Sequence, residues 1–467
     1  MHYPWWYVPL LTSPMLIAIV SVLHVIVSHY AVGGGIFLAL ETHFAYRVGN
    51  KNYLDYLRNH AWFFILVTVV FGAITGVGIW WTIGLASPLA TETLIHIFVF
   101  GWGMEYVFFV IEISSAFAFY YLWGKIDSKQ HIKIGWIYAL SAWISLVLIS
   151  GITAFMLNSG NWLRERNFWV AFLNPQFIPQ VIARTGAALI LASVYVYLHA
   201  SIKLKDEELR QMVFKRSGRP LFLGTLFLII GGSSWYLFLP HSAKAALLAA
   251  SVINVLLMML IASVSVLLIM IYLGPYKNPQ WVNSGFAIML FLFGIGSMAL
   301  GEYIREAVRK PYIVYNVVLS NQLLTDEVSD VKQRGYLESG IWTRRYIYAY
   351  YPDYIVDNKI DESKLLSLPQ NDRINIGHVL FQYHCNDCHS DVNGYIAVGH
   401  LTTGWTPEIV RMIVLHPEKT HFFMPPWLGT NEEAELLVDY IMSMQRAFPP
   451  GMYYGNNKEN INEKQER

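Results

Sequence analysis

Residues 245–273 read AALLAASVINVLLMMLIASVSVLLIMIYL, a continuous stretch that contains no charged side chain. A helix of about 20 apolar residues is long enough to cross the hydrocarbon core of a bilayer, so this stretch predicts a membrane span. The composition agrees, because 55% of the 467 residues are hydrophobic and only 14% are charged. Soluble domains carry about 25% charged residues. The chain has no basic tract that would indicate binding to nucleic acid, and its net charge of +1 is uninformative.

Other apolar runs of similar length lie on both sides of this stretch. We therefore expect an all-α fold, in which a polytopic bundle of about eight transmembrane helices is followed by a small soluble helical domain. The expected spans cover residues 14–45, 60–85, 93–124, 133–157, 179–202, 219–240, 245–273 and 282–307.

The distribution of basic residues predicts the orientation of the bundle. Lys and Arg are concentrated in the loops after the first, third, fifth and seventh spans, whereas the other loops carry only Arg164, Arg166 and Lys244. Loops rich in Lys and Arg remain in the cytoplasm. We therefore expect a multi-pass protein of the bacterial inner membrane, with both termini on the periplasmic side.

The only two cysteines of the chain lie in the motif Cys385-Asn386-Asp387-Cys388-His389. Cys-x-x-Cys-His is the attachment motif of a c-type haem. We expect one covalent haem c, bound through thioethers to Cys385 and Cys388, with His389 as the proximal iron ligand. A zinc site is the alternative, but zinc usually requires a second pair of ligands.

The second axial ligand of this haem is expected from the segment Phe423-Met424-Pro425-Pro426. The two prolines prevent a helix, so Met424 lies on a stiff loop from which its thioether can bind iron. A helix, the haem motif, a Met loop and a closing helix follow in an order that resembles a class I cytochrome c. His384, His400, His416 and His421 are the alternative ligands.

These observations divide the chain into four parts. Residues 1–311 form the transmembrane haem-binding bundle, and residues 312–370 form an extracytoplasmic linker rich in polar and aromatic residues. Residues 371–450 form the cytochrome c domain. The polar tail 451–467 is expected to be disordered.

Polar side chains within the expected spans are costly in lipid, so each is a candidate functional residue. His24 and His29 lie in the first span, and Glu105 and Glu112 lie in the third. Glu302 and Glu306 lie at the end of the eighth span, where Glu306 could instead pair with Arg305 or Arg309. With the expected orientation, His24, Glu105 and the two carboxylates of the last span meet at one depth, where they could bind b-type haem.

Several stretches of the bundle resemble the large subunit of cytochrome bd oxidases. Each motif is short, but their order along residues 15–315 makes the resemblance specific. The matching stretches are His24 with Gly33–Gly35 and Leu40–Thr42, then Gly72–Gly76, Glu105–Ser114, Met156–Asn158 and Glu306–Tyr312.

The resemblance implies roles for individual residues. His24 would bind a high-spin haem of the active-site pair, with His29 as its rival, and Glu306 would bind the other haem, with Glu302 close by. Glu105 would lie beside the haems and Glu112 on the proton path. The resemblance also implies two b-type haems in the bundle, of which one can be haem d, and a second, similar membrane subunit.

Three features depart from the family pattern. Arg184 stands where the family has the histidine of a low-spin haem, and the link Pro240–Lys244 replaces a long loop that helps to bind quinol. The spacing between Glu105 and Glu112 is also one residue shorter than in the family. The haem c domain would then replace quinol as the source of electrons.

We therefore expect a membrane-bound respiratory cytochrome that moves electrons between a periplasmic haem c and b-type haems. A periplasmic redox protein would dock on the haem c domain, and lipid would surround the bundle. One alternative is a non-catalytic electron-transfer subunit of a larger complex, linked to quinone or other carriers and without O2 reduction. Another is a membrane anchor whose bundle holds no haem.

Overall fold

The computed structural model describes residues 6–8 and 10–446. The described residues form two compact units, each considered separately. One unit, here called the bundle, comprises residues 18–84 and 90–317, and the other, here called the head, comprises the described residues within 1–17, 85–89 and 318–467. The expected disordered tail, residues 451–467, lies outside the described residues.

The described residues contain eight helices that are long and apolar enough to cross a membrane. This number and the nearly complete absence of strands among the described residues confirm the expected all-α polytopic bundle. The spans cover Ser13–Val48, Lys51–Ala86, Val99–Tyr121, Ser128–Phe155, Phe177–Lys203, Glu207–Leu237, Ser251–Lys277 and Ser284–Ala307.

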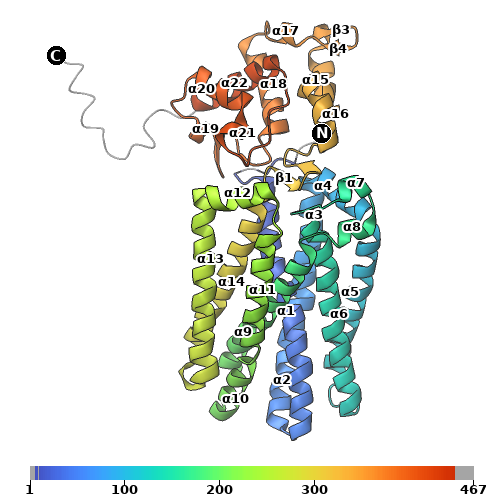
Figure 1. Ribbon diagram of the computed structural model, residues 1–467, viewed down its shortest axis with the longest axis vertical. Coiled ribbons are helices and arrows are strands. Elements are labelled where there is room, and N and C mark those ends of the chain that lie inside the picture. The colour runs from blue at the N-terminus through green and yellow to red at the C-terminus, as the bar shows by residue number, and fades with distance from the viewer. Residues whose placement is uncertain (1–5, 9, 447–467) are drawn as a thin grey trace, which may run out of the picture. The chain divides into compact units, whose positions relative to one another are not determined.

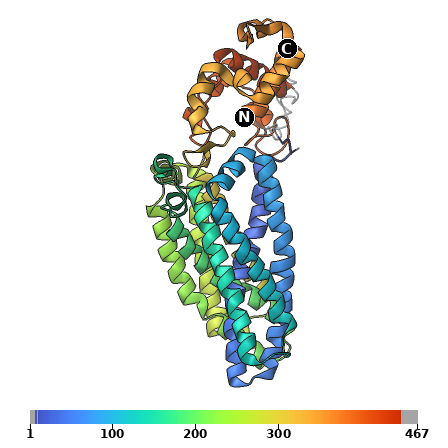
Figure 2. The same ribbon diagram turned by 90° about the vertical axis from the view of Figure 1, so that its right-hand side faces the viewer.

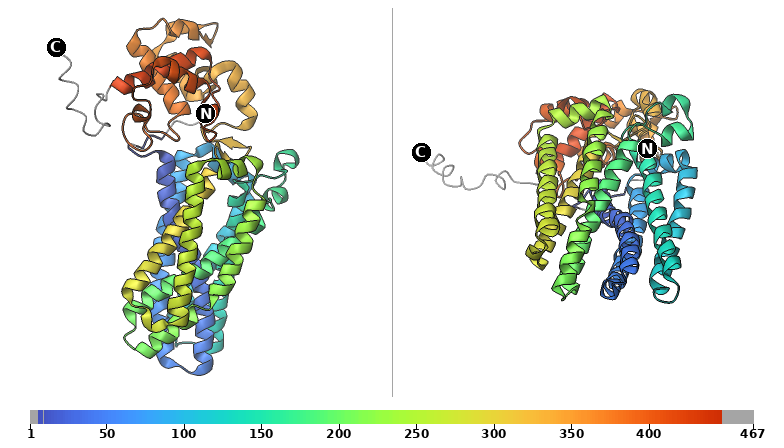
Figure 3. Two further views of the ribbon diagram at one scale, coloured as in Figure 1. Left: turned by 60° about the vertical axis from the view of Figure 1, so that its left-hand side comes forward. Right: turned by 60° about the horizontal axis from the view of Figure 1, so that its bottom comes forward.

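The spans lie side by side in the order that Figures 1 and 3 show. From one side of the bundle to the other, α13 and α14 are followed by α9 and α11, then by α1 and α2, and finally by α6 and α5. Figure 2 views the bundle from the side of α5 and α6. These helices are α1 (Ser13–Val48), α2 (Lys51–Ile65), α5 (Val99–Tyr121), α6 (Ser128–Phe155), α9 (Phe177–Lys203), α11 (Pro220–Leu237), α13 (Ser251–Ile271) and α14 (Ser284–Ala307).

Shorter elements complete the bundle. Asn50 begins α2, because its side chain accepts a hydrogen bond from the backbone N–H of Tyr53 at 3.0 Å. The second span therefore starts nine residues before the hydropathy of the sequence indicates. The remaining elements are η1 (Leu66–Phe71), α3 (Gly72–Ala86), α4 (Pro88–Ile97), α7 (Trp162–Glu165), α8 (Phe168–Phe172), α10 (Glu207–Ser217), α12 (His241–Ala249), η2 (Tyr272–Lys277), η3 (Pro279–Trp281) and β1 (Tyr312–Val314).

Two stretches expected as single spans are divided in the structure. Phe98, with φ −114° and ψ 28°, separates α4 from α5 within the expected span 93–124. Ala250, with φ −80° and ψ 108°, ends α12 and precedes α13, so the stretch 245–273 belongs to two helices. Figure 1 shows α12 lying crosswise to α13. Hydropathy stays high through such a change of direction, so the sequence gives no sign of it.

The head is built around α18 (Gln370–His384) and α22 (Asn431–Arg446), which pack against each other. Gly377 allows this close crossing, because a Cβ at that position would lie 2.1 Å from the backbone oxygen of Leu436. Side chains from both helices, including Ile376, Leu380 and Leu437, are almost completely buried. The crossing therefore forms the core on which the loops of the head rest.

Residues 318–367, expected as a linker, carry regular elements in the head, and α15 packs against both α18 and α22. The strands β3 and β4 pair antiparallel, with Ile355 opposite Ile360. The elements of this stretch are β2 (Val318–Leu319), η4 (Thr325–Glu327), α15 (Val328–Ser339), α16 (Ile341–Tyr350), η5 (Pro352–Tyr354), β3 (Ile355–Val356), β4 (Lys359–Ile360) and α17 (Glu362–Leu365). Three short helices follow between α18 and α22, namely α19 (Val398–Leu401), α20 (Pro407–Leu415) and α21 (Pro417–Thr420).

Candidate functional site

The haem motif of the head begins where α18 ends. The backbone N–H groups of Cys388 and His389 both donate to the Cys385 carbonyl, at 3.1 and 3.0 Å, so the motif forms a tight turn. Both cysteines are half-buried. The Nδ1 atom of His389 lies 2.9 Å from the carbonyl oxygen of Ile396. A hydrogen bond of this kind orients the ring, as is usual for iron-binding histidines.

The loop after α21 carries the expected second ligand. Met424 is half-buried, and its N–H donates to the carbonyl of His421 at 2.9 Å. Burial lowers the pKa of His389, the Ile396 carbonyl opposes this shift, and His421 lowers the pKa further by electrostatic repulsion. The loop that holds Met424 is thus near His389, and the assignment of Met424 as a ligand stays a prediction.

The alternative histidines of the head differ in their surroundings. His384 is buried, and its Nδ1 lies 2.8 Å from the hydroxyl of Tyr336. Burial lowers the pKa of His384 to about 3, and repulsion from His389 adds to the shift. His384 therefore stays neutral and has a structural partner in the described residues, whereas His416 and His421 are exposed.

In the bundle, His24 and His29 of α1 both have one ring nitrogen engaged. Nδ1 of His24 lies 3.2 Å from the Thr75 hydroxyl, and Nδ1 of His29 lies 2.8 Å from the Val25 carbonyl oxygen. Each ring therefore keeps Nε2 for another partner. Gly76 of α3 faces His24, and a Cβ there would lie 3.1 Å from its Cε1 atom. The geometry suits either histidine as a haem ligand and does not choose between them.

The carboxylates at the end of α14 are held in ion pairs. Glu302 accepts from Nε of Arg305 at 2.8 Å, and Glu306 pairs with Arg309 and with Lys310, whose Nζ lies 3.6 Å away. The pairing that the sequence left as an alternative for Glu306 is thus present. A role of either carboxylate as a haem ligand stays a prediction.

The two carboxylates of α5 face hydroxyl groups of α6. Glu105 accepts a hydrogen bond from the Ser145 hydroxyl at 2.9 Å, and Glu112 accepts one from the Tyr138 hydroxyl at 3.1 Å. The contacts of Ser145 and Tyr138 with these carboxylates could not be predicted, because a single sequence does not show how two helices are aligned with each other. Glu105, Glu112, Ser145 and Tyr138 thus form a polar contact between α5 and α6, here called the polar seam, whose side chains can bind protons.

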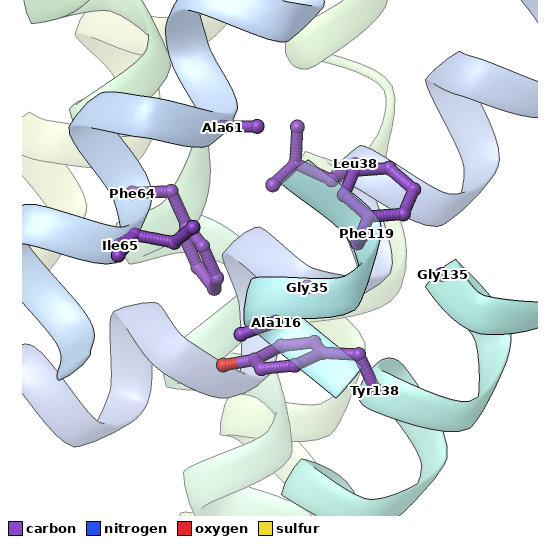
Figure 4. Close-up of a pocket in the computed structure, with 9 residues that line it drawn as sticks. All are labelled: Gly35, Leu38, Ala61, Phe64, Ile65, Ala116, Phe119, Gly135 and Tyr138. Carbon is purple, nitrogen blue, oxygen red and sulfur yellow. The ribbon is translucent and has the colours of Figure 1, made fainter. Parts of the chain in front are cut away.

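A small apolar cavity lies beside this seam, between α1, α2, α5 and α6 (Figure 4). Its volume is about 10 Å³, close to the minimum for one water molecule. The Tyr138 hydroxyl is the only polar side-chain atom among the labelled residues in Figure 4. A water molecule here would have too few hydrogen-bond partners, so the cavity is a packing defect and carries no site.

Eight apolar spans among the described residues define a polytopic membrane protein. The sequence profile of cytochrome bd terminal oxidase subunit I matches residues 13–250, more than half of the chain. The chain therefore belongs to the cytochrome bd terminal oxidase subunit I family. Membership implies a membrane-embedded respiratory protein with b-type haems and a second subunit. Glu302, Glu306 and the part of the head after residue 317 lie beyond the matched residues.

A solved structure agrees with this membership. The bd oxidase from Geobacillus thermodenitrificans is similar with a TM-score of 0.55 and 16% sequence identity, over 64% of this chain and 87% of that chain. At this identity the similarity shows the fold alone. No curated protein matches the chain.

Proposed function

We propose that the chain is the large subunit of a bd-like respiratory complex, in which a haem c in the head and b-type haems in the bundle exchange electrons. The observation that carries the haem c part is the hydrogen bond between His389 Nδ1 and the Ile396 carbonyl. It orients the imidazole of His389 within the attachment motif that also contains Cys385 and Cys388. Family membership supports the part in the bundle.

In the head, Cys385, Cys388 and His389 would hold the haem, with Met424 on the other side of the iron. A haem supplies one-electron transfer, and ligation by His and Met raises its potential. The tight turn of the motif and the close crossing of α18 and α22 give the rigid support that a covalently attached cofactor needs.

In the bundle, His24 would bind one b-type haem, with His29 as the alternative, and Glu306 would bind a second, with Glu302 nearby. One of these haems can be haem d. Both histidines fit the role, since each has a free Nε2. Glu306 fits less directly, because a bound iron would compete with Arg309 and Lys310 for its carboxylate.

Glu105 and Glu112 are the residues that we assign to catalytic proton transfer. Glu112 can receive a proton through the Tyr138 hydroxyl, and Glu105 can share one with Ser145. These residues would serve an oxidase-type reaction in which haem c delivers electrons.

A second candidate function is a non-catalytic electron-transfer subunit. Arg184 favours it, because arginine does not replace a histidine as an iron ligand. The short link favours it as well, since α12 starts at His241, only four residues after α11 ends. In this case electrons would pass between a periplasmic oxidoreductase and quinone or other carriers without O2 reduction.

The proposal includes location and partners. The head and both termini would lie in the periplasm, where haem c is attached, and a periplasmic redox protein would dock near the haem motif. A second bd-like subunit would cover part of the bundle. Helix α5 exposes apolar side chains such as Phe100, Tyr106 and Val107, which fit either lipid or that subunit.

Difference spectra of the purified chain, reduced minus oxidised and with or without CO, test the proposal. We expect a c band together with b bands, and a CO-sensitive band if an open haem site is present. Bands of c and b without any effect of CO would select the electron-transfer subunit. A c band alone would leave only a membrane anchor, and absence of the c band would refute the haem c head.

A further inference from the structure

A chain of buried polar side chains crosses the interior of the bundle away from the seam of α5 and α6. The hydroxyl of Tyr30 in α1 lies 3.1 Å from Nε2 of His60 in α2. Nδ1 of the same His60 lies 3.1 Å from Nδ1 of His199 in α9. Tyr30 and His60 are completely buried and His199 is 6% exposed. None of these residues has a role in the function proposed above.

The hydrogen bonds determine where the protons lie along the row of Tyr30, His60 and His199. A hydrogen bond between two imidazole nitrogens requires one N–H donor and one bare acceptor, so a single proton lies between His60 and His199. His60 uses both ring nitrogens, one toward each neighbour. Neutral imidazole with both nitrogens engaged can accept a proton on one side and release one on the other, as histidine proton shuttles do.

A metal or haem fits this place poorly. The described residues contain no group of three His, Cys, Asp or Glu side chains that could hold a metal ion. Aromatic rings occupy the space around the imidazoles: Phe63 stacks on His199 with ring centroids 4.8 Å apart, and Phe37 meets His60 edge-on at 5.5 Å. A porphyrin cannot enter without displacing these rings.

One end of the chain lies near the end of a span. His199 comes four residues, about one helical turn, before Lys203, the exposed last residue of α9. The ring of Tyr56 lies 5.8 Å from His60 and 5.6 Å from His199, and its buried hydroxyl has no hydrogen-bond partner among the described residues. An unpartnered buried hydroxyl next to two imidazoles is a natural position for an ordered water.

The other end of the chain approaches the seam of α5 and α6. The ring of Phe64 lies between the two systems, with its centroid 5.2 Å from that of Tyr30 and 5.3 Å from that of Tyr138. Tyr138 is the hydrogen-bond partner of Glu112. Phe64 therefore contacts both Tyr30 of the chain of polar residues and Tyr138 of the polar seam between α5 and α6.

We propose that His199, His60 and Tyr30 form a second proton relay, which leads from the Lys203 end of α9 into the bundle interior. A proton that arrives on Nε2 of His199 releases the Nδ1 proton to Nδ1 of His60. The Nε2 proton of His60 then passes to the Tyr30 oxygen, and the Tyr30 hydroxyl proton leaves to a water molecule, which is the acceptor that this step requires in the bundle interior. No electron is exchanged, and each residue ends neutral. This inference rests on the proposed function, since redox chemistry in the bundle creates the demand for protons.

The test measures proton uptake when the haems of the purified full-length protein are reduced electrochemically in weakly buffered solution containing a pH indicator. His60→Phe, His199→Phe and Tyr30→Phe should each slow uptake roughly 100-fold or more, the range typical of a lost proton-transfer group. Their haem bands should match those of the unaltered protein. His43→Phe and His96→Phe are matched controls, because both histidines are exposed, and they should take up protons at the unaltered rate.

The outcomes separate this proposal from the one on which it rests. Unchanged uptake rates in all three variants, with every haem band present, would refute the relay and leave the proposed function intact. Loss of a haem band in His60→Phe or His199→Phe would also refute it, because the pair would then be a haem-binding element. If the unaltered protein shows no b band, the proposed function fails and the relay fails with it. Tyr30→Phe removes one oxygen atom only, so a folding defect does not obscure its result.

Discussion

The head and the bundle each bury one glutamate with little contact to solvent, and they stabilise it in different ways. In the head, Glu433 accepts hydrogen bonds from the backbone N–H groups of Tyr336, Leu337 and Thr430, at 2.9, 2.6 and 3.0 Å. In the bundle, Glu41 binds side chains only, namely Nε and an Nη of Arg216 and the Tyr53 hydroxyl.

The two glutamates have different partners because backbone N–H groups are available as donors in the head and not within the membrane-spanning helices. In a membrane-spanning helix the backbone N–H groups are used inside the helix, so a buried charge must find a partner among side chains of other helices. The head contains turns and helix ends with free N–H groups. Thr430 and Glu433 form a reciprocal cap at the start of α22, since the N–H of Glu433 also donates to the Thr430 hydroxyl at 3.1 Å. Polar networks in the bundle are therefore long and consist of side chains.

The largest expected effect tests whether the two units hold their cofactors independently. Cys385→Ala combined with Cys388→Ala removes both thioethers, so we expect complete loss of covalently bound haem and of the c band. The b bands of the bundle should remain. Haem staining after denaturing electrophoresis and difference spectra measure this. Parallel loss of b bands would mean that the bundle depends on the head, contrary to the comparison.

Removal of a candidate haem ligand in the bundle should leave the haem c signal of the head unaffected. His24→Ala removes the imidazole that lies against Thr75, and we expect loss of one b-type or d-type signal while the c band stays. His29→Ala is the matched variant, because it alters the same helix and the same residue type. If His29→Ala removes the signal and His24→Ala does not, the assignment passes to His29, and if neither does, both assignments are wrong.

The contrast between the units also explains what the sequence could show. The Cys-x-x-Cys-His motif occupies five consecutive residues, so it can be read from local spacing, and the haem c that it indicates stays a prediction. Eight spans were also predictable, because lipid requires long apolar helices. His60 escaped notice because its span was expected to begin at residue 60, whereas α2 begins at Lys51. The contact between His60 and His199 joins residues 139 positions apart, and a single sequence does not reveal which helix faces meet.

Stability measurements sharpen the comparison of the two glutamates. Arg216→Ala leaves Glu41 buried without its cation, and we expect a loss of about 3 kcal/mol, typical of a broken buried ion pair. Glu433→Ala leaves three backbone donors without an acceptor, with an expected loss of about 2 kcal/mol. Thermal unfolding, followed separately at the b and c bands, measures the two units.

Two controls accompany this pair of variants. Adding Glu41→Leu to Arg216→Ala should recover part of the lost stability, because both charges are then absent. Glu432 is the half-exposed neighbour of Glu433, and Glu432→Ala should lower the free energy of unfolding by about 0.5 kcal/mol or less. An equal cost for Glu432→Ala and Glu433→Ala would contradict the role of the backbone donors.

The smallest expected effect is the pH dependence of the head. Glu362 lies close to Glu433, and both meet Thr430, whose hydroxyl contacts Glu362. Burial raises the pKa of both carboxyls above the ordinary value of 4.5; repulsion from Glu362 adds to the shift of Glu433, and repulsion from Glu432 and Glu338 adds to the shift of Glu362. In the folded head these two carboxyls thus bind protons more tightly than in the unfolded chain, so their contribution to stability is greatest below pH 4.5 and falls as the pH rises through neutrality. Glu362→Gln removes the repulsion and should flatten this decline, measured as the unfolding midpoint at the c band between pH 5 and 8. A decline of the same size in Glu362→Gln would show that the two carboxyls titrate independently, and then Glu433 alone, held by its backbone donors, would set the pH response of the head.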